Sequence, residues 1–333
     1  MLRPDIPLIE YCTPFDSKLP GPICLNPRLY APLPPRPLHG GDARGERFPQ
    51  RCRAVFANAF ERLMPSVSGP STVGTAGRRA AMAPATLVYA HRLGGGYGPE
   101  SSRAALERSL SGDLAGLEAD VVLTADDEVL ACHDPLLEIS TADLSGWAHE
   151  HTAAELGRAR LLDTNGRPSD QTVMSLRELL EAIPVDLPLQ LDVKAYADRA
   201  LARRTSQRCC EIAEELRRSE QVEIISFFTA ACEAAAARGY RVRLVSWSDY
   251  DPRALARWAV EHGAGGISLE GFILGPSLHQ AIRETGLTLS VGTVNTAAQL
   301  RRIARFKPEI IVSDRPQELS AALAESASPP AAA

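Results

Sequence analysis

The sequence predicts an α/β fold, because strand-like and helix-like segments alternate from residue 87 onward. The strand-like segments are short, apolar and rich in Val, Leu and Ile, and each is followed by a stretch with the apolar spacing of a helix. Eight such pairs extend over about 240 residues, which is the count of a (β/α)8 barrel. A doubly wound sheet usually has fewer strands and a GxGxxG turn, and the glycines at 94–96 do not continue in that pattern.

Each predicted element rests on local composition. The first two strands, LVYA at 87–90 and GLEADVVLT at 116–124, are rich in Val and Leu, and a helical pattern lies between them. The predicted strands span residues 87–91, 116–123, 188–193, 222–227, 241–247, 266–269, 287–292 and 310–313. The predicted helices span residues 101–110, 175–183, 199–218, 230–238, 252–262, 276–284, 296–306 and 316–324.

Two carboxylates interrupt the second predicted strand. Glu118 and Asp120 lie two residues apart in an apolar run, so strand alternation places both on one face. Such a pair is repulsive and costly to desolvate unless a cation lies between the two groups. The spacing therefore predicts a metal site on this strand.

Other polar groups lie at the ends of the first three strands. His91 ends the first strand, His133 follows the second, and Asp192 and Lys194 share a face at the end of the third. Active residues of (β/α)8 barrels lie at the carboxyl ends of the strands. A packed core tolerates converging charges only when they are compensated, and a hard cation with a phosphate would compensate these.

The ordered set HR, GG, PE, ExD and HD within residues 91–134 resembles the signature of the glycerophosphodiester phosphodiesterase family. The similarity to this family continues downstream of these motifs and spans about residues 87–319. Members of that family are metal-dependent TIM barrels that hydrolyse deacylated phospholipids to glycerol 3-phosphate and an alcohol. The resemblance implies that residues 134–174, which lack a strand–helix rhythm, form a small insertion after the second strand.

The resemblance also implies a role for each site residue. Two histidines would form the general acid/base pair, and three carboxylates would hold a divalent metal, Ca²⁺ or Mg²⁺. The histidines are His91 and His133, and the metal ligands are Glu118, Asp120 and Asp192. Substrate contacts would come from Arg92, Glu100 and Lys194. The attacking nucleophile would be either water or the neighbouring glycerol hydroxyl.

The chain departs from the family pattern at several positions. Asp192 stands where the family usually has Glu, and Leu93 replaces the Gly that usually follows HR. Gly292 stands where the family commonly has Trp, so we expect a wider pocket or a relocated aromatic wall. Trp247, at the end of the fifth strand, is the candidate to replace that wall and to meet a quaternary ammonium group. Asp314 and Arg315 are expected to form a structural pair that closes the barrel.

Composition restricts the class of protein. Residues 1–83 hold 11 Lys and Arg against 6 Asp and Glu, whereas the remainder holds 25 against 35. The acidic body argues against nucleic-acid binding. No apolar run approaches the roughly 18 residues of a bilayer span, and no secretory pattern opens the chain. We therefore expect no stable membrane insertion. The seven cysteines are scattered and without CxxC spacing, which indicates reduced thiols in a cytoplasm.

The two ends of the chain differ from the expected barrel domain at 84–325. Residues 1–83 hold 13 of the 25 prolines and no persistent period. We expect a disordered Pro-rich extension or a start codon assigned too far upstream, with Met82 favoured over Met64 as the true start. A proline-rich arm that binds a partner is a third possibility. The tail at 326–333 is also expected to be disordered.

Two other functions remain open. The first is a phosphodiesterase acting on lysophospholipids or sphingolipids, similar to lysophospholipase D; the absent signal pattern and the lack of a clear exposed apolar loop count against it. The second is a non-catalytic barrel that binds a glycerophosphoryl ligand. Both histidines and all the carboxylates are present, and binding alone would not need them all.

Overall fold

The computed structural model describes residues 86–196, 198–248 and 250–327. The extension expected at 1–83 and residues 328–333 of the expected tail lie outside these ranges. No helix within the described ranges combines the length and apolar character that crossing a membrane requires.

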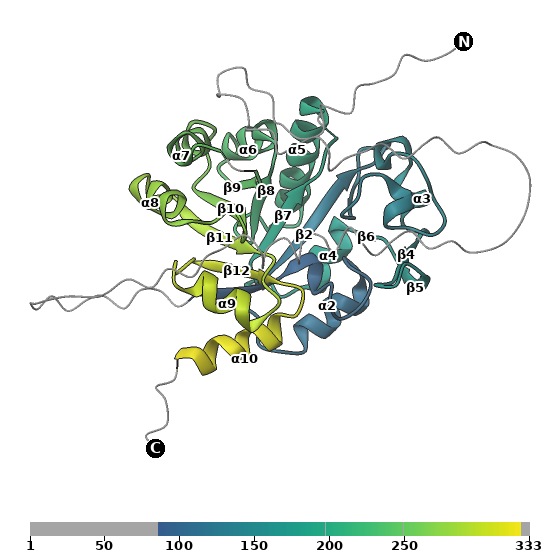
Figure 1. Cartoon of the computed structure of the whole chain (residues 1–333). Coiled ribbons are helices and arrows are strands. Elements are labelled where there is room, and N and C mark those ends of the chain that lie inside the picture. Colours follow the sequence, from purple (N-terminus) through teal and green to yellow (C-terminus); the bar gives the residue numbers. More distant parts are fainter. Residues whose placement is uncertain (1–85, 197, 249, 328–333) are drawn as a thin grey trace, which may run out of the picture. The chain divides into compact units, whose positions relative to one another are not determined.

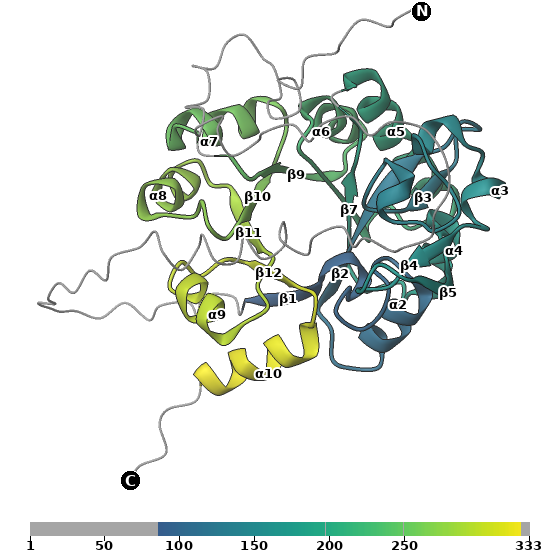
Figure 2. The same ribbon diagram turned by 45° about the vertical axis from the view of Figure 1, so that its right-hand side comes forward.

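Eight parallel strands close into a barrel, as the sequence predicts. Closure is shown by β1, which pairs with β12 on one side and with β2 on the other, so that Leu87 lies beside Ile310 and Tyr89 beside Gly116. Figure 2 shows the strands as a ring with the helices outside it. The strands are β1 (Leu87–Ala90), β2 (Gly116–Leu123), β7 (Leu189–Val193), β8 (Val222–Ser226), β9 (Arg241–Ser246), β10 (Gly266–Glu270), β11 (Thr288–Gly292) and β12 (Ile310–Ser313).

In the described part of the chain, eight helices surround the strands and confirm the predicted alternation (Figure 1). Several begin at side chains that cap the free backbone amides of the first turn. Asp198 accepts hydrogen bonds from two such amides, and Asp251 accepts one ahead of Pro252. The helices are α2 (Arg103–Leu110), α4 (Leu176–Ala182), α5 (Arg199–Glu215), α6 (Thr229–Ala236), α7 (Pro252–Glu261), α8 (Pro276–Glu284), α9 (Ala297–Ala304) and α10 (Pro316–Ala327).

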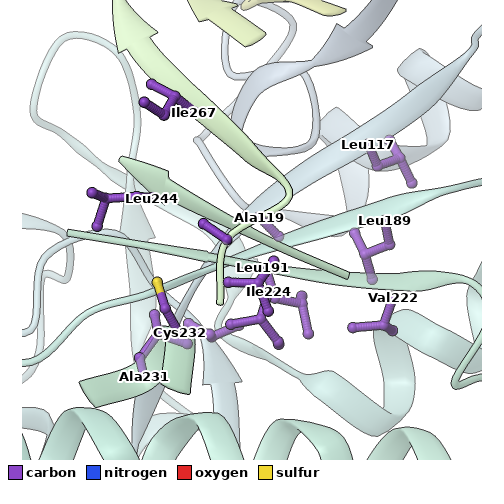
Figure 3. Packing of buried hydrophobic residues seen from close by; sticks show 14 of the residues in the cluster. Leu117, Ala119, Leu189, Leu191, Val222, Ile224, Ala231, Cys232, Leu244 and Ile267 are labelled. Atoms are coloured by element: carbon purple, nitrogen blue, oxygen red, sulfur yellow. The ribbon is translucent and has the colours of Figure 1, made fainter. Parts of the chain in front are cut away.

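Alternation along β2 separates an apolar face from a polar one. On β2, Leu117 and Ala119 belong to the main hydrophobic core, whereas Glu118 and Asp120 take the opposite face. The apolar faces of neighbouring strands meet the helix layer in the same way. Figure 3 shows members of this core from several strands and from α6, including Leu117, Leu191, Ile224, Leu244, Ile267, Ala231 and Cys232.

A small lobe separates β2 from α4, where the resemblance implied an insertion. It has a hydrophobic core of its own, which includes Leu137, Leu156 and Leu161. Its short strands were absent from the sequence prediction, because each is two to five residues long. The lobe contains β3 (Val129–Ala131), antiparallel to β2, then η4 (Leu137–Ile139), η5 (Ala148–Glu150), α3 (Ala153–Leu156), β4 (Arg160–Leu162), β5 (Pro168–Thr172) and β6 (Met174–Ser175).

A polar layer lies toward the amino ends of β7, β8 and β9. Arg243 and Glu223 are both buried, and Arg243 Nε lies 3.0 Å from Glu223 Oε1. Gln190 Nε2 donates a 2.8 Å hydrogen bond to the other oxygen of Glu223. The guanidinium needs the space left by Gly266, where a Cβ would lie 2.5 Å from Arg243 Nη1. The interior of the barrel is therefore held partly by a buried ion pair.

Candidate active site

Three carboxylates meet at the carboxyl ends of β2 and β7. Glu118, Asp120 and Asp192 are all buried, and one oxygen of each lies within 4.8 Å of the others. Parallel pairing explains the contact, since Asp120 and Asp192 are partners in the register of the two strands. The expectation that Glu118 and Asp120 share a face is confirmed.

Among the residues that the structure describes, Lys194 is the cation that lies closest to these carboxylates. Its Nζ is 2.9 Å from Asp120 Oδ1 and 2.6 Å from Asp192 Oδ2. The next contact, from Arg92 Nε to Asp120 Oδ2, is longer at 3.4 Å. Glu118 receives a hydrogen bond of 2.8 Å from the backbone amide of Arg92.

The pKa values reflect this crowding. Burial raises the pKa of Glu118 to about 7, and the charge of Asp120 adds to the rise. Burial also disfavours the ionised form of Asp120, but Lys194, His133 and Arg92 together outweigh it and hold the pKa of Asp120 well below its usual range. Burial raises the pKa of Asp192 despite its contact with Lys194. Glu118 and Asp192 are thus incompletely compensated by the side chains around them, whereas Asp120 is stabilised in its ionised form.

The three carboxylates fit a hard divalent cation. Within the described ranges, Asp120 Oδ2 and Asp192 Oδ1 are buried oxygens without a hydrogen-bond donor. Carboxylate oxygens are the ligands that Ca²⁺ and Mg²⁺ prefer, and an added positive charge would relieve the repulsion that raises the pKa of Glu118. These residues could therefore hold a divalent metal ion.

Both predicted histidines lie beside a carboxylate. His91 Nδ1 is 2.7 Å from Asp314 Oδ1, and His91 Nε2 is 4.0 Å from Glu118 Oε2. His133 Nδ1 is 3.0 Å from Asp134 Oδ1. Burial disfavours the charged imidazole of His91, but Asp314 and Glu118 outweigh it and raise its pKa. Both histidines act electrostatically on Asp120, so they belong to the same site as the carboxylates.

The turn after β1 directs Arg92 into the site. Arg92 and Leu93 have φ values of 50° and 62°, in the left-handed region that glycine adopts most easily. This explains why a glycine suits the position of Leu93, although here the leucine side chain is fully buried. The turn lets the Arg92 amide reach Glu118 while its guanidinium donates a 2.6 Å hydrogen bond to Glu100.

The aromatic side of the barrel mouth follows β8 and β9. Trp247 directly follows β9 and is 38% exposed, so its ring is accessible to a ligand. The ring of Phe227, directly after β8, lies with its centroid 5.4 Å from Lys194 Nζ. A Cβ at Gly292 would lie 3.1 Å from Val312 Cβ, which is tighter than ordinary contact. A larger residue at Gly292 would therefore require Val312 to shift by a few tenths of an ångström.

Two acidic residues near His91 were not among the site residues predicted from the sequence, although contact with substrate was a lesser alternative for Asp314. Asp314 was expected to pair with Arg315, but in the structure it contacts His91 and Asn295. Glu270, at the end of β10, has its pKa raised by burial, against the charges of His91 and other cations of the site. Asp314 could have been found from barrel closure, because the residues after β1 and β12 must be neighbours.

Two curated proteins are similar in sequence to parts of this chain. An uncharacterised protein of Bacillus subtilis is 29% identical over 111 residues, which span 33% of this chain but only 45% of that protein. A glycerophosphodiester phosphodiesterase of Caldanaerobacter subterraneus is 23% identical over 239 residues, covering 70% of this chain and 96% of that one.

Solved structures are similar over the same region. A phosphodiesterase of Oleispira antarctica, solved in complex with the product sn-glycerol-3-phosphate, has a TM-score of 0.64 at 20% identity. The match covers 72% of this chain and 97% of that one, and it shows a shared fold. The profile of the glycerophosphoryl diester phosphodiesterase family matches residues 91–318, which include every candidate site residue. The chain belongs to the glycerophosphoryl diester phosphodiesterase family.

Proposed function

We propose that the chain hydrolyses glycerophosphodiesters to glycerol 3-phosphate and an alcohol, with a divalent cation held by Glu118, Asp120 and Asp192. Its family is one of phosphoric diester hydrolases. The observation that carries the proposal is the meeting of these three buried carboxylates at one barrel end, beside His91 and His133. When bound, the cation would polarise the phosphoryl group and offset the negative charge that develops on its oxygens.

His91 and His133 form the general acid/base pair. One imidazole takes the proton of the nucleophile, and the other gives a proton to the leaving alkoxide. Imidazole suits both tasks because its ordinary pKa is close to neutral pH. Asp314 lies against Nδ1 of His91 and holds that ring in place, and Asp134 Oδ1 lies 3.0 Å from His133 Nδ1. The nucleophile is water or the neighbouring glycerol hydroxyl, and the second choice gives a cyclic phosphate first.

Arg92, Glu100 and Lys194 complete the substrate site. Arg92 offers forked donors to phosphate oxygens, and Glu100 holds its guanidinium at 2.6 Å. Lys194 adds a second positive charge beside the carboxylates. Trp247 supplies an aromatic face for the leaving alcohol, where a quaternary ammonium group would be attracted to the ring.

The direct test is release of glycerol 3-phosphate from glycerophosphocholine by the full chain, with and without EDTA. We expect turnover that EDTA abolishes and that added Mg²⁺ or Ca²⁺ restores. His91→Ala and His133→Ala should each bind the ion yet lose about 10²- to 10⁴-fold in rate. His262→Ala is the matched control, because His262 contacts Glu233 on the helix layer and should leave the rate unchanged.

Other outcomes identify the alternatives. Near-normal rates in either site variant would refute the assignment of that histidine. Turnover restricted to lysophospholipids would favour the lipid phosphodiesterase, with the product phosphate identified by ³¹P NMR. Binding of glycerol 3-phosphate without turnover of any diester would favour the non-catalytic barrel.

A further inference from the structure

The ring of His91 is held by residues that follow the last two barrel strands. His91 directly follows β1 and Asp314 directly follows β12, and the preceding residues of the two strands are register partners. This places Asp314 Oδ1 at 2.7 Å from His91 Nδ1, although 223 positions separate the two residues in the sequence. The other polar neighbour of the same nitrogen, Thr293 Oγ1, is farther away at 3.5 Å.

Asn295 determines which oxygen of Asp314 faces His91. The Asn295 Oδ1 atom accepts hydrogen bonds from the Asp314 amide at 2.9 Å and from the Ser313 hydroxyl at 3.0 Å. Two donors at one atom identify that atom as the oxygen of the amide group. The amide nitrogen of Asn295 must then point to Asp314 Oδ2, which it meets at 2.6 Å. One oxygen of Asp314 therefore accepts from Asn295, and the other faces His91.

The same contacts specify the tautomer of His91. A carboxylate that accepts on both oxygens requires a donor at His91 Nδ1. The other neutral tautomer would place the nitrogen lone pair 2.7 Å from a carboxylate oxygen, so two acceptors would face each other. His91 Nε2 is then the unprotonated nitrogen of the neutral ring, and it lies on the side of Glu118.

We propose that Asn295 and Asp314 are positioning residues that hold neutral His91 as the Nδ1–H tautomer, so that Nε2 is the atom that exchanges a proton with substrate. The inference rests on the proposed function for the identity of that substrate. The side-chain contacts of Asp314 are with His91 and Asn295, and no contact that the structure describes joins Asn295 or Asp314 to the carboxylates that would hold the cation. Their effect should therefore separate from metal binding.

The tautomer is measured directly by long-range ¹H–¹⁵N correlation on the full chain labelled with ¹⁵N-histidine. The His91 signals are assigned by their loss in His91→Gln. At a pH where the ring is neutral, we expect the Nδ1-protonated pattern in the wild type. Asp314→Ala should give a mixture of tautomers. Asp314→Asn, which keeps the shape of the side chain, is the second variant if the alanine variant folds poorly. Asn295→Ala should produce a smaller shift in the same direction.

A matched control comes from the second histidine. Asp134→Asn removes the carboxylate beside His133 and should alter the His133 signals while leaving the His91 pattern unchanged. A solely structural Asp314 would lower the melting temperature of its variants without changing the tautomer of His91 in the folded protein. The proposal is overturned by an Nε2-protonated His91 in the wild type, or by an unchanged tautomer ratio in Asp314→Ala.

Kinetics supply a second readout. Asp314→Asn and Asn295→Ala should lower kcat by about 10- to 100-fold. The KM for glycerophosphocholine and the Kd for the divalent ion should stay within about twofold, since neither residue is among those proposed to bind the phosphate or the ion. A matched loss of ion affinity would contradict the proposal. If the wild type releases no glycerol 3-phosphate, the proposed function fails, whereas the tautomer of His91 is still decided by the spectra.

Discussion

Lys194 Nζ and Asp192 Oδ2 lie 2.6 Å apart at the carboxyl end of β7. The same Nζ reaches Asp120 Oδ1 at 2.9 Å, so a single ammonium bridges two of the three buried carboxylates. No ammonium of the described residues contacts Glu118, whose nearest cationic group is His91 Nε2 at 4.0 Å, and burial and Asp120 raise its pKa to about 7. The site is therefore built with more negative charge than its own cations balance, and the energetic consequences of that imbalance can be measured.

Removal of the bridging ammonium should strengthen ion binding and weaken catalysis. In Lys194→Met, the loss of a nearby positive charge should lower the Kd for Mg²⁺ by about tenfold. Turnover should nevertheless fall by about 100-fold, because a charge that stabilises the phosphoryl group is gone. Calorimetric titration measures the Kd. Lys307→Met, at an exposed position, should change neither quantity, and weaker ion binding by Lys194→Met would contradict this view of the site.

Glu118 should make the metal-free fold sensitive to pH. Its pKa is raised from 4.5 to about 7 by burial and by Asp120, so the folded protein keeps this proton to a higher pH than the unfolded chain does. The stability due to this group is complete below about pH 4.5 and is lost as the pH rises through about 7. Glu118→Gln should remove that loss and raise the melting temperature of the EDTA-treated protein at pH 8 by about 5 °C.

The control for Glu118 is an exposed acid. Glu107→Gln, on the surface of α2, should leave the melting temperature and its dependence on pH unchanged. An unchanged or lower melting temperature in Glu118→Gln at pH 8 would mean that the carboxylates are compensated within the chain.

The buried ion pair inside the barrel should matter for stability and little for catalysis. Glu223→Gln leaves the charge of Arg243 without its carboxylate partner, and we expect a loss of about 3–5 kcal/mol in the free energy of unfolding. The pair lies toward the amino ends of the strands, so kcat/KM of the folded fraction should stay within about twofold. Urea denaturation measures the first quantity. A near-wild-type stability of Glu223→Gln would show that the pair is dispensable.

Trp247 should distinguish substrates by the charge of the leaving alcohol. Its exposed ring follows β9 at the barrel mouth. A cation–π contact contributes about 0.5–2 kcal/mol, so Trp247→Ala should raise KM for glycerophosphocholine by about two- to thirtyfold. The neutral substrate glycerophosphoglycerol is the control and should show no such rise. Equal changes for both substrates would assign Trp247 to packing alone.

The sequence allowed the barrel to be predicted because its strands and helices carry their own patterns. The alternation in GLEADVVL placed Leu117 and Ala119 in the core and Glu118 and Asp120 on the opposite face, as the structure confirms. The strands of the lobe could not be predicted in this way. The strand β5 reads PSDQT, and it forms because β4 pairs with it rather than because of its composition.

The parts of the site that were not predicted depend on contacts between residues far apart in the sequence. The segment around Asp314 and Arg315 gives no local reason to connect Asp314 with His91, and only closure of β12 against β1 brings them together. Asn295 likewise reaches Asp314 across the ends of β11 and β12. The turn at Arg92 depends on a left-handed backbone at Leu93. A leucine at that position gives no reason to predict this conformation, which glycine adopts most easily.

Dependence of the hydrolysis on a divalent ion held by the three carboxylates is tested most directly by a parallel titration of the metal-stripped protein with Mg²⁺ or Ca²⁺. Calorimetry follows binding, and release of glycerol 3-phosphate from glycerophosphocholine follows activity. We expect one ion per chain, turnover that rises with the same Kd as binding, and loss of both in Asp120→Asn. Full turnover by the metal-stripped protein, or undiminished ion binding by Asp120→Asn, would contradict this expectation.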